Sequence, residues 1–438
     1  MVRVVATGDG GLCRVRLPGG WLDAAAARAL AAAAREHGSG ELDATNRANL
    51  QIRGVRAGHE AALAAALIAA DPGSRPGPPP DLAAAALRDD VRNLMLSPAA
   101  GRDPAALADT RALGAALLDR LQDEPRFAAL SPKCSLSIDG GEALAELAHP
   151  HDLWFSAYRD AHGALRYAFG VAGHTPVAAD DPPALASVAP EQVVDCAHAL
   201  LLAFLELAPP EAKRIRDALA SLDAKQLLAH AAARLTPAPQ RDAALTAWRR
   251  APADLARRFG IHNEMNAATR QVGGQVPLGR LDAATLEALA ALAERDGDGT
   301  LRFTPWQGVL LPAVREQTAE AALASLASLG VACTADAPLA HLVACAGSTG
   351  CARARADTKA DARALAERRA APLEIHLSGC PRACAQPWPA AVTLIAVEPG
   401  RYDLYRRDGD NGFGRLAARH LTIDQAAAML AASPRHQD

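Results

Sequence analysis

Four of the eight cysteines lie within 40 residues, in two pairs whose spacing suits a metal centre. Five residues separate Cys345 from Cys351, three separate Cys380 from Cys384, and 28 lie between the pairs. Four thiolates can hold a zinc ion or an iron–sulfur cluster. Structural zinc usually takes paired cysteines roughly two to four residues apart, so the wider gap favours a cluster. Zinc and four buried structural cysteines remain the alternatives.

Glycines lie beside these thiols, at Gly347, Gly350 and Gly379. A residue without a Cβ lets the backbone approach closely, and backbone N–H groups are the donors that the sulfur atoms of a cluster need. The other cysteines are scattered, at positions 13, 134, 196 and 333. We expect these four to be core residues.

Basic residues in separate stretches form a second candidate group. They are Arg47 and Arg53 in Thr45-Asn-Arg-Ala-Asn-Leu-Gln-Ile-Arg-Gly54, Arg92 in Asp90-Val-Arg-Asn93, and Lys133 after Ser131-Pro132. Arginine binds carboxylates through a fork of two hydrogen bonds, and lysine supplies a mobile point charge. With 46 basic and 49 acidic residues the net charge is −3, so an anionic ligand requires a local patch. Gathered in one cleft, these four residues would form it.

The composition excludes several classes of partner. Aromatic residues make up only 4% of this nearly neutral chain, which argues against nucleic acid. No apolar run approaches the roughly 20 residues that cross a bilayer, so no membrane is expected. The N-terminal residues lack the pattern of a signal peptide. We therefore expect a cytoplasmic protein whose thiols stay reduced.

An internal repeat indicates how these residues are positioned. Leu17–Leu30 and Val276–Leu289 align without gaps at an offset of 259, and the match continues to Val55 and Val314. Each copy predicts a strand, a turn, a helix that begins after an aspartate and ends at a glycine, and a second strand. The predicted N-caps are Asp23 and Asp282.

A weaker repeat follows. Asp109-Thr-Arg111 lies 248 positions before Asp357-Thr-Lys359, and Leu130-Ser-Pro132 lies 247 before Leu377-Ser-Gly379. We interpret the chain as two α+β halves around a pseudo-two-fold axis, joined by a helical insert, with a ligand cleft between them. The second alignment places Lys133 near the position of Cys380. One half would then supply the anion-binding residues and the other the redox centre.

The segments Ala344–Cys351 and His376–Cys384 resemble the paired 4Fe–4S motifs of the nitrite/sulfite reductase superfamily. Residues 45–54, 90–101 and 131–141 resemble further motifs of that superfamily, in the same order. The resemblance implies an α+β fold with two pseudo-symmetric halves, each a small ferredoxin-like half-domain followed by a larger unit. We place the half-domains at 1–72 and 268–332, the larger units at 80–180 and 333–438, and the helical insert at 185–260. The Pro/Gly-rich residues 71–80 are expected to form an exposed connection.

Within the superfamily, the chain resembles the precorrin-3B synthases in its length, in Ser131–Gly141 and in Thr304-Pro-Trp306. Ser135 stands where sulfite and nitrite reductases usually have a second lysine. The resemblance implies O2-dependent hydroxylation of precorrin-3A with lactone formation, in aerobic cobalamin biosynthesis. The carboxylates of the tetrapyrrole would be held by Arg47, Arg53, Arg92 and Lys133.

The same resemblance implies the cofactors. The cluster would be bound by the four paired cysteines, and a mononuclear iron is implied whose ligands the sequence does not identify; His341 and His376 are expected to be structural. NADH would supply electrons, and because no G-x-G-x-x-G follows a predicted strand, a separate reductase would deliver them. One alternative is a sirohaem sulfite or nitrite reductase, with sirohaem bridged through Cys384. Another is a non-catalytic iron–sulfur protein that carries electrons or senses redox state.

Overall fold

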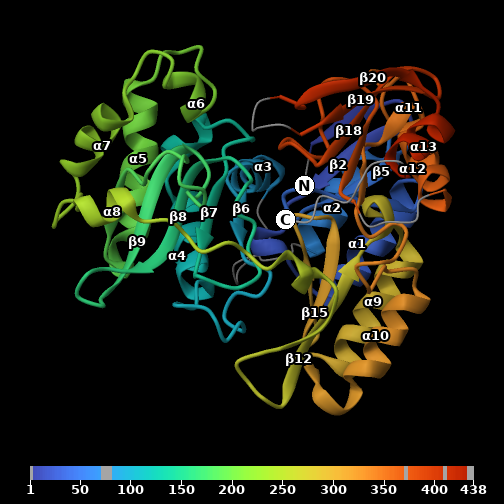
Figure 1. The fold of residues 1–438 in the computed structure, drawn as a ribbon. Coiled ribbons are helices and arrows are strands. Elements are labelled where there is room, and N and C mark those ends of the chain that lie inside the picture. The colour runs from blue at the N-terminus through green and yellow to red at the C-terminus, as the bar shows by residue number, and fades with distance from the viewer. Residues whose placement is uncertain (1–2, 71–80, 369–372, 408–411, 432–438) are drawn as a thin grey trace.

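Four five-stranded β-sheets form the framework of the computed structural model, which describes residues 3–70, 81–368, 373–407 and 412–431. The predicted connection at 71–80 lies outside the described residues. Figure 1 shows one lobe built around β6–β9 and helices α4–α8, and a second group of sheets and helices beside it. The predicted mixed α+β class is confirmed. None of the described helices is long and apolar enough to cross a bilayer.

Two of the sheets are antiparallel and exchange one strand with each other. The first has the order β1-β2-β5-β4-β13 and the second the order β11-β12-β15-β14-β3. Their strands are β1 Val4–Thr7, β2 Gly10–Val15, β3 Trp21–Asp23, β4 Glu41–Ala44, β5 Leu50–Val55, β11 Gly260–Asn263, β12 Thr269–Gln275, β13 Arg280–Asp282, β14 Thr300–Phe303 and β15 Gly308–Arg315. Because β3 and β13 are equivalent in the repeat, each half completes its sheet with a strand of the other.

The helices of these small units follow the predicted local signals. They are α1 Ala24–His37, α2 Glu60–Ala70, α9 Ala283–Asp296 and α10 Ala319–Ser328. The Asp23 and Asp282 side chains accept hydrogen bonds from the third residue beyond them, so both predicted N-caps are confirmed. Helices α1 and α9 pack together, and the ion pairs Arg28–Glu294 and Arg35–Glu287 are equivalent under the 259-residue offset. Such reciprocal contacts are those of a two-fold interface.

Backbone conformation repeats with the same offset. Positive φ angles occur at five equivalent pairs: Gly19 and Leu278, Gly20 and Gly279, Gly40 and Gly299, Ala48 and Gln307, Gly54 and Ala313. Side chains with a Cβ rarely adopt this conformation. Leu278, Gln307 and Ala313 adopt it without glycine, so the fold of the repeat, rather than the residue type, dictates the turn.

The two larger sheets share one topology. The orders β6-β7-β8-β9-β10 and β16-β17-β18-β19-β20 each begin with three parallel strands and end with two antiparallel ones. Their strands are β6 Leu94–Leu96, β7 Leu136–Asp139, β8 His151–Arg159, β9 Leu165–Gly173, β10 Ala186–Val188, β16 Leu342–Ala344, β17 Ile375–Ser378, β18 Val392–Glu398, β19 Arg401–Arg406 and β20 Arg415–Leu421. The matching registers place β16 248 residues after β6, and β17 and β18 239 residues after β7 and β8.

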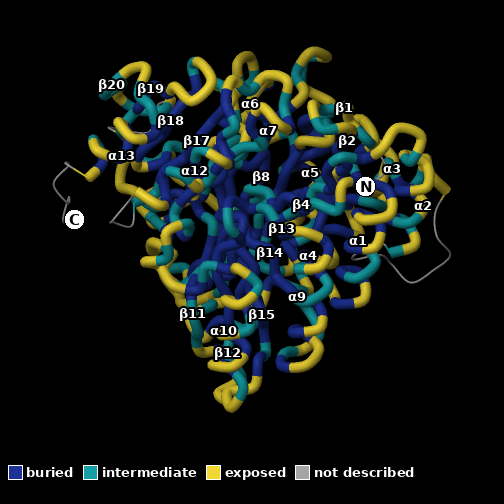
Figure 2. Tube along the Cα trace, turned by 90° about the vertical axis from the view of Figure 1, so that its right-hand side faces the viewer, coloured by how far each residue is buried: buried dark blue, intermediate teal, exposed yellow. Residues whose placement is uncertain are grey.

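Helices accompany these sheets, and two pairs of them occupy corresponding places. The helices are α3 Leu82–Asp90, α4 Arg111–Asp123, α5 Val193–Leu207, α11 Gly347–Gly350, α12 Thr358–Glu367 and α13 Ile423–Ala431. Helix α4 corresponds to α12, and α5 follows the last strand of its sheet as α13 does. The helices without a helical counterpart in the described residues are α3, α11, α6 Ile215–Ala218, α7 Ala224–Ala232 and α8 Ala243–Ala247. Apolar residues between helices and sheets form a separate core in each large unit, and Figure 2 shows buried chain through the middle of the molecule.

The sheet topology corrects one predicted equivalence. Lys133 lies three residues before β7, whereas Cys380 lies two residues after β17. The two residues therefore occupy opposite ends of equivalent strands, and the counterpart of Cys380 is Gly141. The alignment through Leu130 and Leu377 was wrong because it ignored the shorter connection before β17.

Candidate functional site

The four paired cysteines lie in loops at the carboxyl ends of two neighbouring parallel strands. Cys345 directly follows β16, and Cys380 follows β17. Cys351 ends α11, and Cys384 lies in the loop that leads toward β18. Because parallel strands end at the same edge of a sheet, this topology brings both loops together. All four are free thiols; Cys384 is exposed and the other three are half-buried.

The contacts of these thiols indicate a site with backbone donors. The Gly379 N–H donates to Cys345 Sγ at 3.2 Å, and the Thr358 Oγ1 lies 3.5 Å from the same sulfur. A Cβ at Gly379 would approach the Ala354 Cβ to 2.5 Å, so this close approach requires glycine. Burial raises the pKa of Cys384, and the charges of Cys380, Cys345 and Cys351 raise it further. The four thiols are therefore within electrostatic reach of one another.

This donor set fits a multi-iron cluster. In the described part of the chain, no three His, Cys, Asp or Glu side chains converge on a single-ion site. A 4Fe–4S cluster is a larger body that takes one thiolate at each iron, so its ligands need not meet at one point. Four free thiols on two loops, with an N–H group directed at one sulfur, match that requirement.

The first half of the chain contacts the cysteine loops through its β4–β5 turn. The Asn46 side chain donates to the Cys384 carbonyl at 3.2 Å. The turn is closed by hydrogen bonds from the backbone N–H groups of residues 47 and 49 to Thr45 Oγ1, and it requires the positive φ of Ala48. Arg14 on β2 is also near: partial burial and Arg16 lower the pKa of Arg14, while the Cys384 thiolate acts in the opposite direction. Sequence reasoning identified neither Asn46 nor Arg14.

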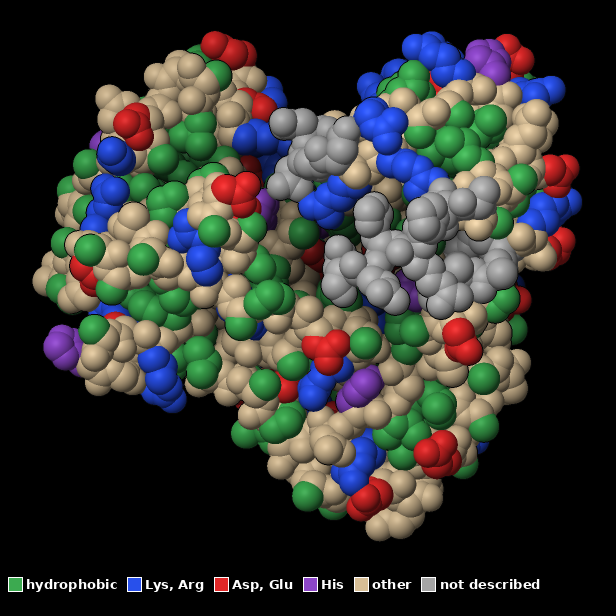
Figure 3. Space-filling view, viewed as in Figure 1, with side chains coloured by type: hydrophobic (Ala, Val, Ile, Leu, Met, Phe, Trp, Pro, Cys, Tyr) green, Lys and Arg blue, Asp and Glu red, His purple; other side chains and the backbone are tan. Residues whose placement is uncertain are grey.

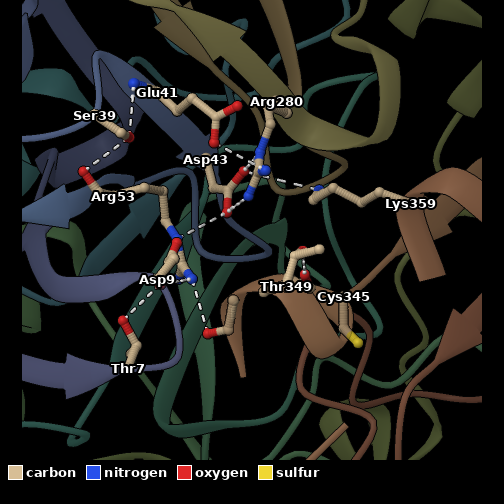
Figure 4. Close-up of polar contacts among 12 residues, drawn as sticks. Thr7, Asp9, Ser39, Glu41, Asp43, Arg53, Arg280, Cys345, Thr349 and Lys359 are labelled. Atoms are coloured by element: carbon tan, nitrogen blue, oxygen red, sulfur yellow. Dashed lines mark hydrogen bonds and ion pairs between the residues drawn. The ribbon is translucent and has the colours of Figure 1, made fainter. Parts of the chain in front are cut away.

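Arg53 lies beside the other cysteine loop, with protein partners. Its side chain is 3% exposed, and its guanidinium donates to both carboxylate oxygens of Asp9, at 2.8 and 3.0 Å, and to the Gly350 carbonyl at 2.9 Å. Figure 4 shows these contacts. They tie β5 to the residue before Cys351. Contact of Arg53 with a bound carboxylate stays a prediction.

Arg47, Arg92 and Lys133 come from segments that meet around residues 131–135. The Arg47 guanidinium donates to the Lys133 carbonyl at 3.4 Å. Asn93, next to the buried Arg92, donates to the Pro132 carbonyl at 3.1 Å, and Arg16 Nη2 donates to the same oxygen at 3.1 Å. The Lys133 side chain is exposed. Figure 3 shows Lys and Arg side chains on both walls of the hollow between the two lobes.

The helical segment contributes a residue to this basic region. Arg214, just before α6, binds the Asp152 carboxylate at 2.7–2.9 Å, and Asp152 also accepts the N–H of Ser135 at 2.8 Å. Burial, followed by the charge of Arg214, lowers the pKa of Arg47 to about 10. The sequence offered no signal for Arg214, because an arginine in an Ala/Leu-rich stretch resembles a solvated surface residue.

Two buried histidines lie at the start of β8, and the sequence analysis missed them. His149 and His151 have ring centroids 4.7 Å apart, and His149 also contacts the Trp388 ring at 5.4 Å. His149 Nδ1 lies 3.1 Å from the Pro150 carbonyl, while its Nε2 and both ring nitrogens of His151 have no hydrogen-bond partner in the described residues. Burial lowers the pKa of His149 to about 3 and that of His151 well below its usual range. The spacing His-x-His was the available signal.

The remaining predicted assignments concern cysteines and histidines outside the site. Cys13, Cys134, Cys196 and Cys333 are buried, which confirms them as core residues. His341 Nε2 pairs with the Ala335 carbonyl at 2.8 Å. His376 lies on β17 and is buried.

Comparison with family models places most of the chain in one family. Residues 4–70 and 263–329 match the nitrite/sulfite reductase ferredoxin-like half domain, and residues 88–237 match the nitrite and sulphite reductase 4Fe-4S domain. The second match covers the first large unit, which lacks the cysteine quartet. The second large unit has the same strand order, as described above.

Curated relatives span nearly the whole chain. A ferredoxin–nitrite reductase of Synechococcus elongatus is 31% identical over 91% of this chain and 77% of its own length. A chloroplastic ferredoxin–nitrite reductase of Zea mays is 30% identical over 86% of this chain and 67% of its own. A precorrin-3B synthase of Sinorhizobium sp is 29% identical over 93% of this chain and 81% of its own. The solved NirA protein of Mycobacterium tuberculosis has a TM-score of 0.77 at 20% identity, over 96% of this chain and 79% of its own, and shares the fold.

Proposed function

Because this chain belongs to the nitrite and sulfite reductase family and is an oxidoreductase of that family, we propose that it hydroxylates precorrin-3A with O2, the precorrin-3B synthase reaction. The product carries a new hydroxyl at a meso carbon, and a neighbouring acetate side chain closes a lactone. One oxygen atom enters the substrate and the other leaves as water, with two electrons and two protons. These electrons come from NADH through a separate reductase.

Ser135 is the observation that carries this proposal over the reductase alternative. It stands two residues after Lys133, where the reductases usually have a second lysine. Ser135 is 2% exposed, and its backbone N–H donates a hydrogen bond to the Asp152 carboxylate. A small inorganic oxyanion would therefore meet one lysine rather than two at this loop. Neutral O2 requires no such pair of cations.

The coverage of the relatives differs little between the two candidate activities. This chain spans 81% of the precorrin-3B synthase relative, compared with 77% and 67% of the two nitrite reductases. The identities of the three relatives, 29–31%, do not discriminate.

The basic residues bind and orient the substrate in this proposal. Precorrin-3A carries several carboxylates. The half-buried Arg47 and the exposed Lys133 both lie at the loop 131–135, where charged donors would reach a ligand. The Arg214–Asp152 pair fixes that loop through Ser135. Arg92 and Arg53 are buried, and Arg53 holds the Gly350 carbonyl beside Cys351; contact of these two residues with the substrate carboxylates stays a prediction.

The cysteines hold the cluster in this proposal. Cys345, Cys351, Cys380 and Cys384 would bind the 4Fe–4S cluster, which supplies electrons one at a time when bound. Asn46 holds the Cys384 carbonyl, and Arg53 holds the Gly350 carbonyl, so the first half fixes both cysteine loops.

Two side chains could bind the mononuclear iron that the family resemblance implies. His149 and His151 present three buried ring nitrogens without partners, and the contact from His149 Nδ1 to a carbonyl is a usual feature of metal-binding histidines. The centroids of the two rings lie 4.7 Å apart, so both imidazoles could bind the same ion. The described residues supply no third side chain, so water or substrate would complete this site.

The decisive experiment is anaerobic purification and reconstitution, followed by iron and sulfide analysis, electron paramagnetic resonance and an assay with precorrin-3A, O2 and a reducing system. We expect a 4Fe–4S signal, no sirohaem absorbance and formation of the hydroxy-lactone. A protein that turns over nitrite or sulfite but not precorrin-3A would contradict the proposal.

The second candidate function is a sirohaem nitrite or sulfite reductase, favoured by the two nitrite reductase relatives. It predicts bound sirohaem and turnover of nitrite or sulfite with reduced ferredoxin. A cluster with neither activity nor tetrapyrrole binding would instead indicate an electron carrier or redox sensor.

A further inference from the structure

We propose that a buried ionic network behind the cysteine loops, formed by Asp43, Arg53, Arg280 and Lys359, raises the reduction potential of the cluster through the cations Lys359 and Arg53. This inference rests on the cluster of the proposed function. Lys359 and Arg53 act as positioning and electrostatic residues, without contact to the reacting atoms.

Asp43 on β4 is the centre of the network. Its carboxylate accepts two hydrogen bonds from Arg280, at 2.8 and 3.0 Å, and lies 3.7 Å from Arg53 and 3.8 Å from Lys359. Asp43 is 8% exposed. Figure 4 shows the three cations converging on it from different elements.

Lys359 connects this centre to the first cysteine loop. It lies in the first turn of α12 and is 6% exposed, and its Nζ donates to the Leu278 carbonyl at 2.5 Å. The preceding residue, Thr358, donates its hydroxyl to the Cys345 carbonyl at 2.9 Å. Burial lowers the pKa of Lys359, and the charges of Asp43 and Cys345 oppose that shift. The ammonium group is therefore held close to one of the cluster ligands.

Arg53 connects Asp43 to the part of that loop that carries Cys351. It donates to the Gly350 carbonyl, next to Cys351, and its remaining contacts are with the carboxylates of Asp9 and Asp43. Three cations thus surround one buried carboxylate, whereas the side chains of the other two carboxylates, Asp9 and Glu41, are 24% and 45% exposed. Buried charges are poorly screened and exposed ones are well screened, so the three cations around Asp43 outweigh the carboxylates and place a positive potential at the neighbouring cysteine loops.

A positive potential favours the reduced cluster, because reduction adds one electron and the net charge near a cluster contributes to its potential. The charge arrangement is not required by the fold. The counterparts of Lys359, Asp43, Arg280 and Arg53 in the other half are Arg111, Arg302, Trp21 and Pro312. There Arg302 lies over the Trp21 ring at 3.7 Å and Arg111 pairs with Asp109 at the surface. The equivalent sheet therefore forms without the network.

The test is a spectroscopic redox titration of the reconstituted protein and its variants. Lys359→Met removes the cation, and we expect a more negative midpoint potential; Asp43→Asn removes the anion, and we expect a more positive one. Lys359→Arg keeps the charge and should stay close to wild type. Arg111→Met, the matched change in the other half, should have no effect. Opposite shifts cannot arise from general loosening of the site.

Iron and sulfide analysis of each protein separates the possible failures. Unchanged potentials, or shifts of the same sign, in proteins that all contain the cluster overturn the inference. If the wild-type protein binds no cluster, the proposed function fails first. Should Lys359→Met fail to fold, Asp43→Asn decides alone: a more positive potential supports the inference and any other result overturns it.

Discussion

The two large units place equivalent loops on equivalent strands, but the side chains on those loops differ in kind. The loops are joined by the same backbone hydrogen bond, Leu107 N to Gly140 O at 2.8 Å in the first unit and Arg355 N to Gly379 O at 2.9 Å in the second. In the first unit, the positions of Cys345, Cys351, Cys380 and Cys384 are occupied by Ser97, Asp103, Gly141 and Ala145. One backbone framework thus carries two chemistries.

In the first unit, the hydroxyl and carboxylate side chains at these positions form hydrogen bonds between the two loops. Ser97 Oγ donates to the Leu144 carbonyl at 2.6 Å, and Asp103 accepts the Ala143 N–H at 2.8 Å. The thiols of the second unit are free, and three of them are only half-buried. Hydrogen bonds within the protein therefore stabilise the pair of loops in the first unit. In the second unit, the four free thiols are available as metal ligands.

The basic cleft shows the reverse asymmetry. Arg16, Arg47 and Arg92 in the first half correspond to Gln275, Trp306 and Ala340 in the second. These basic residues and the paired cysteines therefore come from different halves, and Asn46 joins the two halves through the Cys384 carbonyl. A duplicated fold can divide two tasks in this way because each large unit keeps its own core while its loops vary.

Cys384→Ala should have the largest effect on the difference between the two large units. Removing one of four cluster ligands should abolish the cluster absorbance and all turnover, because the second unit would resemble the first at this position. Iron content and the electron paramagnetic resonance signal measure the effect. Cys333→Ala, a change at a buried core cysteine, should retain both. A cluster that survives in Cys384→Ala contradicts the assignment.

Arg53→Ala should have the next largest effect. It leaves Asp9 and the Gly350 carbonyl without their buried donor, and loss of one partner of a buried ion pair costs about 3–5 kcal/mol. We expect a lower thermal midpoint of the apoprotein and poor cluster incorporation. Arg315→Ala, at an exposed position, serves as the control. Equal midpoints for the two variants would show that the Arg53 contacts do not stabilise the cysteine loop.

Arg47→Ala tests the anion-binding half. Loss of a charge-assisted hydrogen bond should weaken binding of a carboxylate-rich tetrapyrrole roughly 10- to 100-fold, which corresponds to about 1.5–3 kcal/mol. Absorbance titration at two salt concentrations measures the effect, and the affinity of the variant should depend less on salt. The cluster spectrum should be unchanged. Affinity equal to wild type would remove Arg47 from the binding cleft.

The smallest effect concerns His376, whose counterpart in the first unit is Ser137. Burial lowers the pKa of His376 to about 4, so the folded protein keeps this side chain neutral while the unfolded chain takes up a proton near pH 6.5. Stability should therefore fall as the pH drops below about 6.5, by about 1–2 kcal/mol between pH 7 and 5 from this group.

Urea unfolding of the apoprotein at both pH values measures this dependence. His376→Asn should show a smaller difference between pH 7 and pH 5 than the wild-type protein. His149 and His151 contribute in the same direction in both proteins and so cancel in the comparison. An identical pH dependence would show that His376 does not titrate with unfolding.

The sequence by itself determined the local features and the duplication. The caps at Asp23 and Asp282, the glycines that end α1 and α9, and the buried character of the scattered cysteines follow from rules that act over a few residues. The 259-residue repeat predicted two halves because equivalent segments must fold alike. The cysteine spacing identified the candidate metal centre for the same reason, since each pair lies on one short loop.

Only the tertiary structure decided which distant residues meet. Three contacts join segments that are far apart in the chain. They are the exchange of β3 and β13 between sheets, the ion pair of Arg214 with Asp152, and the hydrogen bonds of Arg53 to Asp9 and Gly350. Sequence patterns indicate which face of a helix or strand is buried. Which distant residue a side chain contacts depends on how the sheets pack against each other. For that reason the sequence identified the paired cysteines as a candidate site but misplaced Lys133 relative to them.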